Sequence, residues 1–296
     1  MKYFKPLGKI CVNPKYVNRV RFSPDNNKIV AAFNDNTIRI YDIKLKTEIQ
    51  SLNGHSKTIM SVQFSPNGNT ILSCSRDNTI RLWDVNSGRE LIAVKGHTNH
   101  ITSARFLPDG NTVVSAFDDN TIRLWNMRSG KEIIKLVTLS DTINDVKFSF
   151  DGQIIVALSF DNTIEIFDVH SGKTINELKG HLDNVLNSRF SPNGCSIVSC
   201  SSDNTIRIWD VKTGKEIQKL KVHPYQVLDA IYSPDGQTLI SCSDDDTIRL
   251  WDVKFGMEIQ KLEGHFNDLT AADVSPDGNI IVSSSKDGTI WLWGQL

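Results

Sequence analysis

The sequence has few of the features that mark secreted, membrane or metal-binding proteins. Its first residues include no apolar stretch of the roughly 7 to 15 residues that a secretory signal needs. No run anywhere approaches the roughly 18 apolar residues of a membrane span. The five cysteines form no C-x-x-C pair, so neither a disulfide framework nor a zinc site is indicated. We therefore expect a cytoplasmic or nuclear protein with free thiols.

The chain also lacks an excess of charge and the common catalytic motifs. Lysine and arginine total 33 and the acidic residues 34, so no net field is available to hold a polyanion or an anionic membrane. The patterns G-x-x-x-x-G-K-[ST], H-E-x-x-H and G-x-G-x-x-G are absent. We expect no enzyme activity, no cofactor, no metal and no membrane partner, and nucleic acid is an unfavoured ligand.

What the chain does contain is enough apolar sequence for a packed protein. Hydrophobic residues make up 39% and charged residues 23%, which is ordinary globular usage. A single hydrophobic core stops growing at about 250 to 300 residues. With 296 residues, the chain is therefore either two domains or one modular architecture.

A strict internal repeat decides between these two possibilities. An aromatic residue recurs seven times at an interval of 42 residues: Tyr41, Trp83, Trp125, Phe167, Trp209, Trp251 and Trp293. An aspartate lies six residues before each aromatic: Asp35, Asp77, Asp119, Asp161, Asp203, Asp245 and Asp287. Thr-Ile begins two residues after each aspartate. A fixed period of this length predicts one array of seven equal units.

The local pattern predicts that each unit is made of strands. In the second unit, residues 79–83 alternate with period 2 and are rich in β-branched and aromatic side chains, and 61–64 and 70–75 are similar. Turn-forming sequences, 65–68 and 76–78, separate them. No stretch leaves room for a helix of about ten residues. Each unit is therefore expected to hold four short antiparallel strands, a to d.

Seven such sheets, stacked face to face, are expected to close into a ring. The last unit ends after its third strand, and residues 4–10 align with the fourth strand of the first unit. We therefore predict an all-β, seven-bladed propeller that forms a single domain over residues 1–296. Residues 4–10 would complete the blade formed by residues 267–293 and pair its open edge.

Four of the units carry a Gly-His pair 29 residues before the terminal tryptophan, beginning at Gly54, Gly96, Gly180 and Gly264. Together with the Trp-Asp pairs, these pairs resemble the signature of WD40 repeats over essentially the whole chain. The repeats are also similar to those of heterotrimeric G-protein β subunits. The resemblance implies a propeller and, in each complete blade, a hydrogen-bonded tetrad of His, Ser, Asp and Trp. The matching sets are His55, Ser73, Asp77 and Trp83; His97, Ser115, Asp119 and Trp125; His181, Ser199, Asp203 and Trp209; His223, Ser241, Asp245 and Trp251; and His265, Ser283, Asp287 and Trp293.

Repeats 1 and 4 lose the histidine, serine and tryptophan together but keep the aspartate. We infer that the aspartate also serves the b–c turn through backbone hydrogen bonds. A hydrolase triad would use the same residue types, but it would occur once and present an exposed serine, whereas this set recurs five times. We therefore interpret the tetrads as structural.

The remaining candidates for function lie on the surface, where the d–a and b–c loops meet at one end of the ring. Residues there form the candidate partner-binding face: Tyr16, Met60, Arg76, His100, Asp118, Phe160, Leu186, Leu228, Asp244 and Lys286. Phe160, Leu186 and Leu228 belong to consecutive blades and could form one exposed patch; alternatively, the leucines fill the channel wall.

These observations favour a non-catalytic scaffold or adaptor that binds a peptide or a partner protein on its loop face, as a subunit of a larger complex. One alternative is a hydrolase-like enzyme in the central channel, for which Asp145 and Asp229 would be the seat. A nucleic-acid-binding propeller is a weaker alternative, because Arg76 and Lys286 lie among acidic residues.

Overall fold

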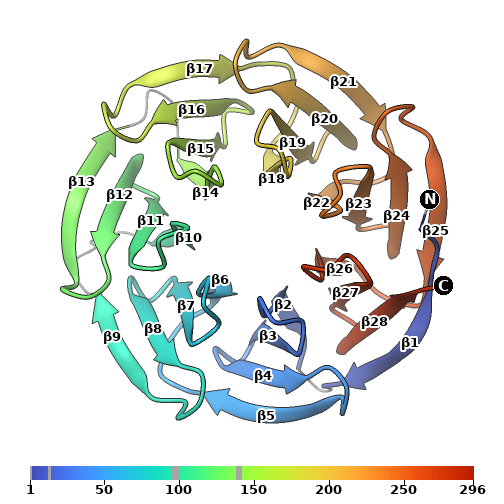
Figure 1. Ribbon diagram of the computed structural model, residues 1–296, viewed down its shortest axis with the longest axis horizontal. Coiled ribbons are helices and arrows are strands. Elements are labelled where there is room, and N and C mark those ends of the chain that lie inside the picture. The colour runs from blue at the N-terminus through green and yellow to red at the C-terminus, as the bar shows by residue number, and fades with distance from the viewer. Residues whose placement is uncertain (1, 13–14, 95–99, 138–141) are drawn as a thin grey trace.

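The computed structural model describes residues 2–12, 15–94, 100–137 and 142–296. These residues form seven four-stranded antiparallel sheets arranged as blades around a central opening (Figure 1). In each blade, strand a lies beside the opening and strand d at the circumference (Figure 1). The predicted all-β, seven-bladed propeller is therefore confirmed.

The described residues contain 28 strands, which we group by blade. Blade 1 consists of β2 (Val17–Phe22), β3 (Lys28–Phe33), β4 (Ile38–Asp42) and β5 (Thr47–Leu52). Blade 2 consists of β6 (Ile59–Phe64), β7 (Thr70–Ser75), β8 (Ile80–Asp84) and β9 (Glu90–Val94). Blade 3 consists of β10 (Ile101–Phe106), β11 (Thr112–Phe117), β12 (Thr121–Asn126) and β13 (Lys131–Val137). Blade 4 consists of β14 (Ile143–Phe148), β15 (Ile154–Ser159), β16 (Ile164–Asp168) and β17 (Thr174–Leu178).

The remaining three blades repeat this order. Blade 5 consists of β18 (Val185–Phe190), β19 (Ser196–Ser201), β20 (Thr205–Asp210) and β21 (Glu216–Lys221). Blade 6 consists of β22 (Val227–Tyr232), β23 (Thr238–Ser243), β24 (Thr247–Asp252) and β25 (Glu258–Glu263). Blade 7 consists of β26 (Leu269–Val274), β27 (Ile280–Ser285), β28 (Thr289–Gln295) and β1 (Phe4–Cys11).

The hydrophobic core is divided among the interfaces between blades. Val30 and Ile38 of blade 1, for example, pack in one cluster with Val62, Ile71 and Trp83 of blade 2. Strand b is buried on both faces, since every residue of β7 after Thr70 is buried. A single sheet could not bury both faces, so each blade depends on its neighbours for stability.

The b–c turns need one residue in the left-handed backbone region. Asparagine occupies this position in five blades, with φ between 60° and 70°: Asn36, Asn78, Asn120, Asn162 and Asn204. Asp246 and Gly288 take the same position in blades 6 and 7. These residue types tolerate positive φ at little cost, which explains why each strand b reverses into strand c at the same point.

The N-terminal strand closes the ring by pairing with the last strand of the chain. Ile10 of β1 lies opposite Ile290 of β28, in the register that Leu52 and Ile38 have in blade 1. Both termini lie at the circumference beside this strand (Figure 1). The backbone of Phe4 exchanges two hydrogen bonds of 2.8 and 2.9 Å with the Gln260 side chain of blade 6. The β1 strand therefore contacts the neighbouring blade as well as its own.

Among the described residues, no helix has the length and apolar character needed to cross a membrane.

Candidate functional site

The tetrads of blades 2, 5, 6 and 7 are hydrogen-bonded networks inside the blades. In blade 2, Trp83 Nε1 donates to Ser73 Oγ at 2.8 Å, and Ser73 Oγ lies 2.7 Å from His55 Nε2. The other ring nitrogen, Nδ1, lies 2.8 Å from Asp77 Oδ2. The equivalent distances in the other three blades are between 2.8 and 3.0 Å.

Burial determines the protonation of these networks. It lowers the pKa of His55 and His265, so both rings are neutral at pH 7. Asp77 Oδ2 can only accept, so the proton of the neutral His55 ring lies on Nδ1, and Nε2 accepts from the Ser73 hydroxyl. Burial also raises the pKa of Asp77, but hydrogen bonds from Thr79 and His55 outweigh this effect and leave the pKa below its usual value.

In blades 1, 3 and 4, the described residues form only part of the tetrad network. In blade 3, Trp125 Nε1 donates to Ser115 Oγ at 2.7 Å, while His97 lies outside the described residues. In blade 1, Lys15 forms an ion pair with Asp35. Asp161 of blade 4 accepts from the backbone N–H and the hydroxyl of Thr163.

The aspartate has the same second role in every blade. Its Oδ1 accepts the backbone N–H of the threonine two residues later at 2.8 to 3.2 Å, from Thr37 to Thr289. This shared contact accounts for the persistence of Asp35 and Asp161 where the rest of the tetrad is missing.

The tetrads offer no exposed nucleophile. Ser73, Ser199, Ser241 and Ser283 have no exposed surface, and each hydroxyl already contacts an indole N–H and an imidazole nitrogen. A hydrolase serine must instead be open to substrate. The geometry therefore fits a structural role.

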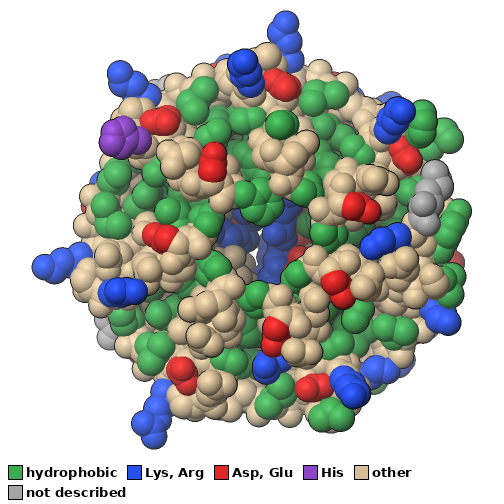
Figure 2. Space-filling view, viewed as in Figure 1, with side chains coloured by type: hydrophobic (Ala, Val, Ile, Leu, Met, Phe, Trp, Pro, Cys, Tyr) green, Lys and Arg blue, Asp and Glu red, His purple; other side chains and the backbone are tan. Residues whose placement is uncertain are grey.

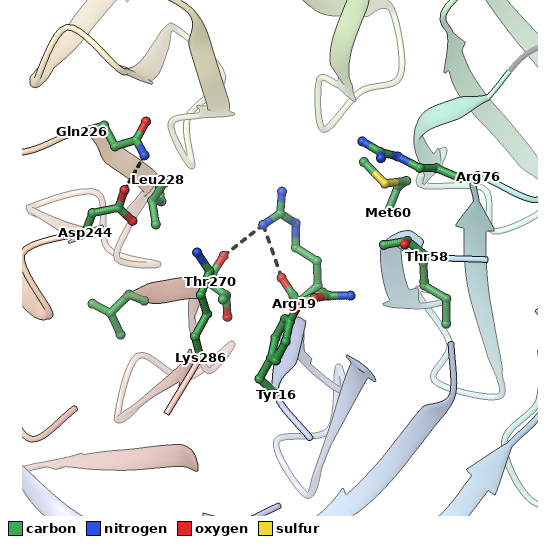
Figure 3. Close-up of a pocket in the computed structure, with 13 residues that line it drawn as sticks. Tyr16, Arg19, Thr58, Met60, Arg76, Gln226, Leu228, Asp244, Thr270 and Lys286 are labelled. Carbon is green, nitrogen blue, oxygen red and sulfur yellow. Dashed lines mark hydrogen bonds between the residues drawn. The ribbon is translucent and has the colours of Figure 1, made fainter. Parts of the chain in front are cut away.

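A cavity of about 380 Å³ lies at the loop end of the central channel, and we call it the loop-end cavity. The first residues of the a strands and the b–c turns of blades 6, 7, 1 and 2 form its wall (Figure 3). Tyr16, Met60 and Leu228 supply apolar surface, while Arg19, Arg76, Asp244 and Lys286 supply charge.

Several polar groups in the loop-end cavity are held by neighbours. Arg19 Nη1 donates to the Thr270 carbonyl at 2.9 Å (Figure 3). Gln226 Nε2 donates to Asp244, and Lys286 Nζ to Asp268 at 2.8 Å. Within the described residues, the hydrogen bonds of Arg19 go to backbone carbonyls, those of Asn18 and Thr270, and no carboxylate forms an ion pair with it.

The structure brings six of the ten candidate face residues together in the loop-end cavity: Tyr16, Met60, Arg76, Leu228, Asp244 and Lys286. The other four, His100, Asp118, Phe160 and Leu186, do not line it. Phe160 is 43% exposed on its own b–c turn. Leu186 and Leu228 pack against core clusters between blades, as channel-wall residues would.

Sequence reasoning missed a row of exposed apolar residues in the d–a loops. Leu182, Tyr225 and Phe266 of consecutive blades 5, 6 and 7 are 79%, 61% and 85% exposed. Two of them directly follow a tetrad histidine, and this fixed position in the repeat is the signal that could have identified them. They lie in the same set of loops that surrounds the loop-end cavity.

Sequence reasoning also missed the charged network along the channel. Asp145 contacts Lys147 and lies 3.4 Å from Arg105, and Asp229 lies 3.4 Å from Arg21. Burial raises the pKa of Asp145, but Lys147 and Arg105 outweigh this effect and hold the pKa well below its usual value. Asp145 is therefore an ionised counter-charge, which gives a specific reason to disfavour it as the seat of general acid catalysis.

The cysteines divide into two groups. Cys74, Cys200 and Cys242 are fully buried, and burial raises the pKa of all three thiols, that of Cys74 to about 11. Cys11 and Cys195 are exposed. The described residues contain no group of three or more His, Cys, Asp or Glu side chains arranged to hold a metal ion.

The repeats match a known family. The family model described as WD domain, G-beta repeat matches residues 4–42, 46–84, 88–126, 133–168, 172–210, 214–252 and 256–294. No curated protein matches the chain.

Proposed function

Because the chain belongs to the WD40 repeat family, we propose that it is a non-catalytic scaffold that binds a peptide or partner protein over the loop-end cavity. The loop-end cavity is the observation that carries this proposal. It combines apolar surface, cations and one carboxylate in a hollow that four blades share. Binding pockets of this kind place a few polar groups among apolar side chains.

The composition of the loop-end cavity indicates the chemistry of the partner. Arg19, Arg76 and Lys286 outnumber Asp244, and Lys286 already pairs with Asp268. A peptide that inserts an acidic side chain beside Arg19 would be held by a charge-assisted hydrogen bond. An adjacent apolar side chain would contact Tyr16, Met60 and Leu228.

The exposed d–a residues extend this surface outward. Tyr225 and Phe266 belong to blades 6 and 7, which also form part of the cavity wall. Aromatic residues are the usual anchors of protein interfaces, and several hundred Å² of exposed apolar surface marks an interaction site. A partner domain that covers the cavity would contact these loops as well.

Random-peptide display against the intact chain tests this proposal. We expect enriched peptides to combine an acidic and an apolar residue, and Tyr16→Ala with Arg76→Glu to weaken their binding at least tenfold. Both residues are exposed, so the fold should tolerate the changes. Phe150→Ala, on the a–b turns at the other end of the channel, is the matched control. Equal binding by the double variant, or loss of binding in the control alone, would contradict the assignment of the face.

A further inference from the structure

A second cavity, of about 430 Å³, lies at the other end of the channel, where the a–b turns meet. Its outer wall is apolar and includes Pro66, Pro108 and Phe150, and Arg105, Lys147 and Arg189 also line it. Figure 2 shows lysine or arginine side chains within the central opening. We call this space the a–b-end cavity.

The channel strands carry more positive than negative charge. Five cations extend from the a strands: Arg19, Arg21, Arg105, Lys147 and Arg189. Three carboxylates extend from the same set of strands, namely Asp145, Asp229 and Asp273. Two positive charges therefore have no counter-charge from these strands, although the chain as a whole has a net charge of -1.

Arg189 is the cation with the poorest set of partners. Its Nε and Nη2 atoms are buried and donate no hydrogen bond to an acceptor of the described residues. The nearest carboxylate oxygen, Asp229 Oδ2, lies 3.9 Å from Nη2, which is too far for a hydrogen bond. Buried donors without partners cost free energy, so an anion that accepts from Nε and Nη2 would stabilise Arg189, whose side chain is 24% exposed and finds no such acceptor among the described residues.

Burial and nearby positive charges both lower the pKa of cations that line this cavity. Burial lowers the pKa of Arg189, and nearby Arg21 lowers it further. Burial and then Arg105 lower the pKa of Lys147 well below its usual value, although Lys147 contacts Asp145. An anion near these groups would offset both burial and mutual repulsion.

We propose that the a–b-end cavity binds a small anion of the phosphate type, held by Arg189, Arg105 and Lys147. Guanidinium groups form bidentate hydrogen bonds with phosphate oxygens, and an ammonium group adds a point charge. The proposed ligand is either free phosphate or a phosphate monoester whose organic group contacts Phe150. Phe150 is 65% exposed and stands where the other six repeats have proline.

Thermal unfolding of the intact chain in inorganic phosphate tests the site, with chloride at matched ionic strength as the reference. A wild-type Tm rise of about 5 °C is expected when phosphate is at about 100 times its dissociation constant. Arg189→Met should raise the Tm of the phosphate-free protein, because it removes two buried N–H donors that have no acceptor among the described residues, and should abolish the phosphate effect. Arg89→Met, an exposed arginine on an outer strand connection, should change neither value.

Three results would overturn the proposal. Two of them are a phosphate effect of equal size in wild type and Arg189→Met, and the absence of any phosphate effect in wild type. The third is a lower Tm for phosphate-free Arg189→Met, which would make Arg189 a structural residue. Calorimetric titration with phenyl phosphate distinguishes the two possible ligands. If phenyl phosphate binds more tightly than inorganic phosphate, and Phe150→Ala removes this advantage, the ligand is a monoester. If the two bind equally, the ligand is the free anion. The site lies at the opposite end of the channel from the loop-end cavity, so its failure would leave the scaffold proposal standing.

Discussion

Replacing Asp245 by alanine tests how much one tetrad stabilises its blade. Asp245 lies 2.8 Å from His223 Nδ1, accepts from Thr247 N and Oγ1 at 3.1 and 2.6 Å, and lies 3.2 Å from Arg249 Nη2. The variant loses all of these contacts and leaves Nδ1 of the buried His223 ring without its partner, while Nε2 keeps its contact with Ser241. We expect guanidinium chloride unfolding, followed by tryptophan fluorescence at pH 7, to show a clear loss of stability.

The size of this loss follows from the pKa of the carboxylate. Burial raises the pKa of Asp245, but hydrogen bonds from His223 and Thr247 outweigh it and lower the pKa from 3.8 to about 2. A shift of this size corresponds to about 2 kcal/mol, which partial exposure of the site reduces to about 1 to 2 kcal/mol. The unpaired His223 donor adds about 1 to 2 kcal/mol. We therefore expect Asp245→Ala to cost about 2 to 4 kcal/mol.

The matched control is Asp161→Ala, because this aspartate makes the turn contact with Thr163 but belongs to a blade in which Ala157 and Phe167 replace the serine and the tryptophan of the tetrad. We expect a cost of about 1 kcal/mol. The lowered pKa also predicts a pH dependence: the Asp245 contribution is complete above about pH 4 and is lost as the pH falls toward 2. Equal costs for the two variants, or a wild-type advantage that does not shrink below pH 4, would refute this reasoning.

Two further predictions concern ring closure and the thiols. Deleting residues 1–11 removes β1 and the buried side chains of Phe4 and Ile10, so we expect a Tm lower by at least 10 °C in calorimetry. The control is Lys5→Ala, which changes an exposed residue of the same strand and should melt like the intact chain. With Ellman's reagent, the two exposed thiols, Cys11 and Cys195, should react in the native protein, and the three buried ones only after denaturation. Rapid native labelling of Cys74 would contradict its burial.

Much of the fold could be predicted because residues that make the same contacts occur at the same positions in seven repeats. The interval between aromatics placed the strands, and the alignment of residues 4–10 with a d strand identified the closing strand. The turn role of Asp35 and Asp161 was also predictable, because these residues persist where their tetrad partners do not. The strand and turn contacts lie within one blade at a fixed separation along the chain, whereas the closing strand joins the two ends of the chain and was identified only by its alignment with a d strand.

The candidate site was predictable only in part. Six of the ten proposed face residues line the loop-end cavity. The other four belong to blades 3, 4 and 5, which do not form its wall, because register in the repeat gives a position within a blade and not the blades that share a cavity: His100, Asp118, Phe160 and Leu186. The ring brings Tyr16 and Lys286 to one cavity across blades 1 and 7. Their proximity depends on the closure of the ring, and the spacing of the repeat does not indicate it.

By itself, the sequence determined the number of blades, their strand order and the strand that seals the ring, because period, alternation and turn chemistry are local properties of the chain. Only the tertiary structure decided which charges meet in the channel. Arg21 and Asp229 are 208 residues apart and form an ion pair. Their contact exists because seven a strands converge on one axis, where burial makes each charge depend on partners from other blades.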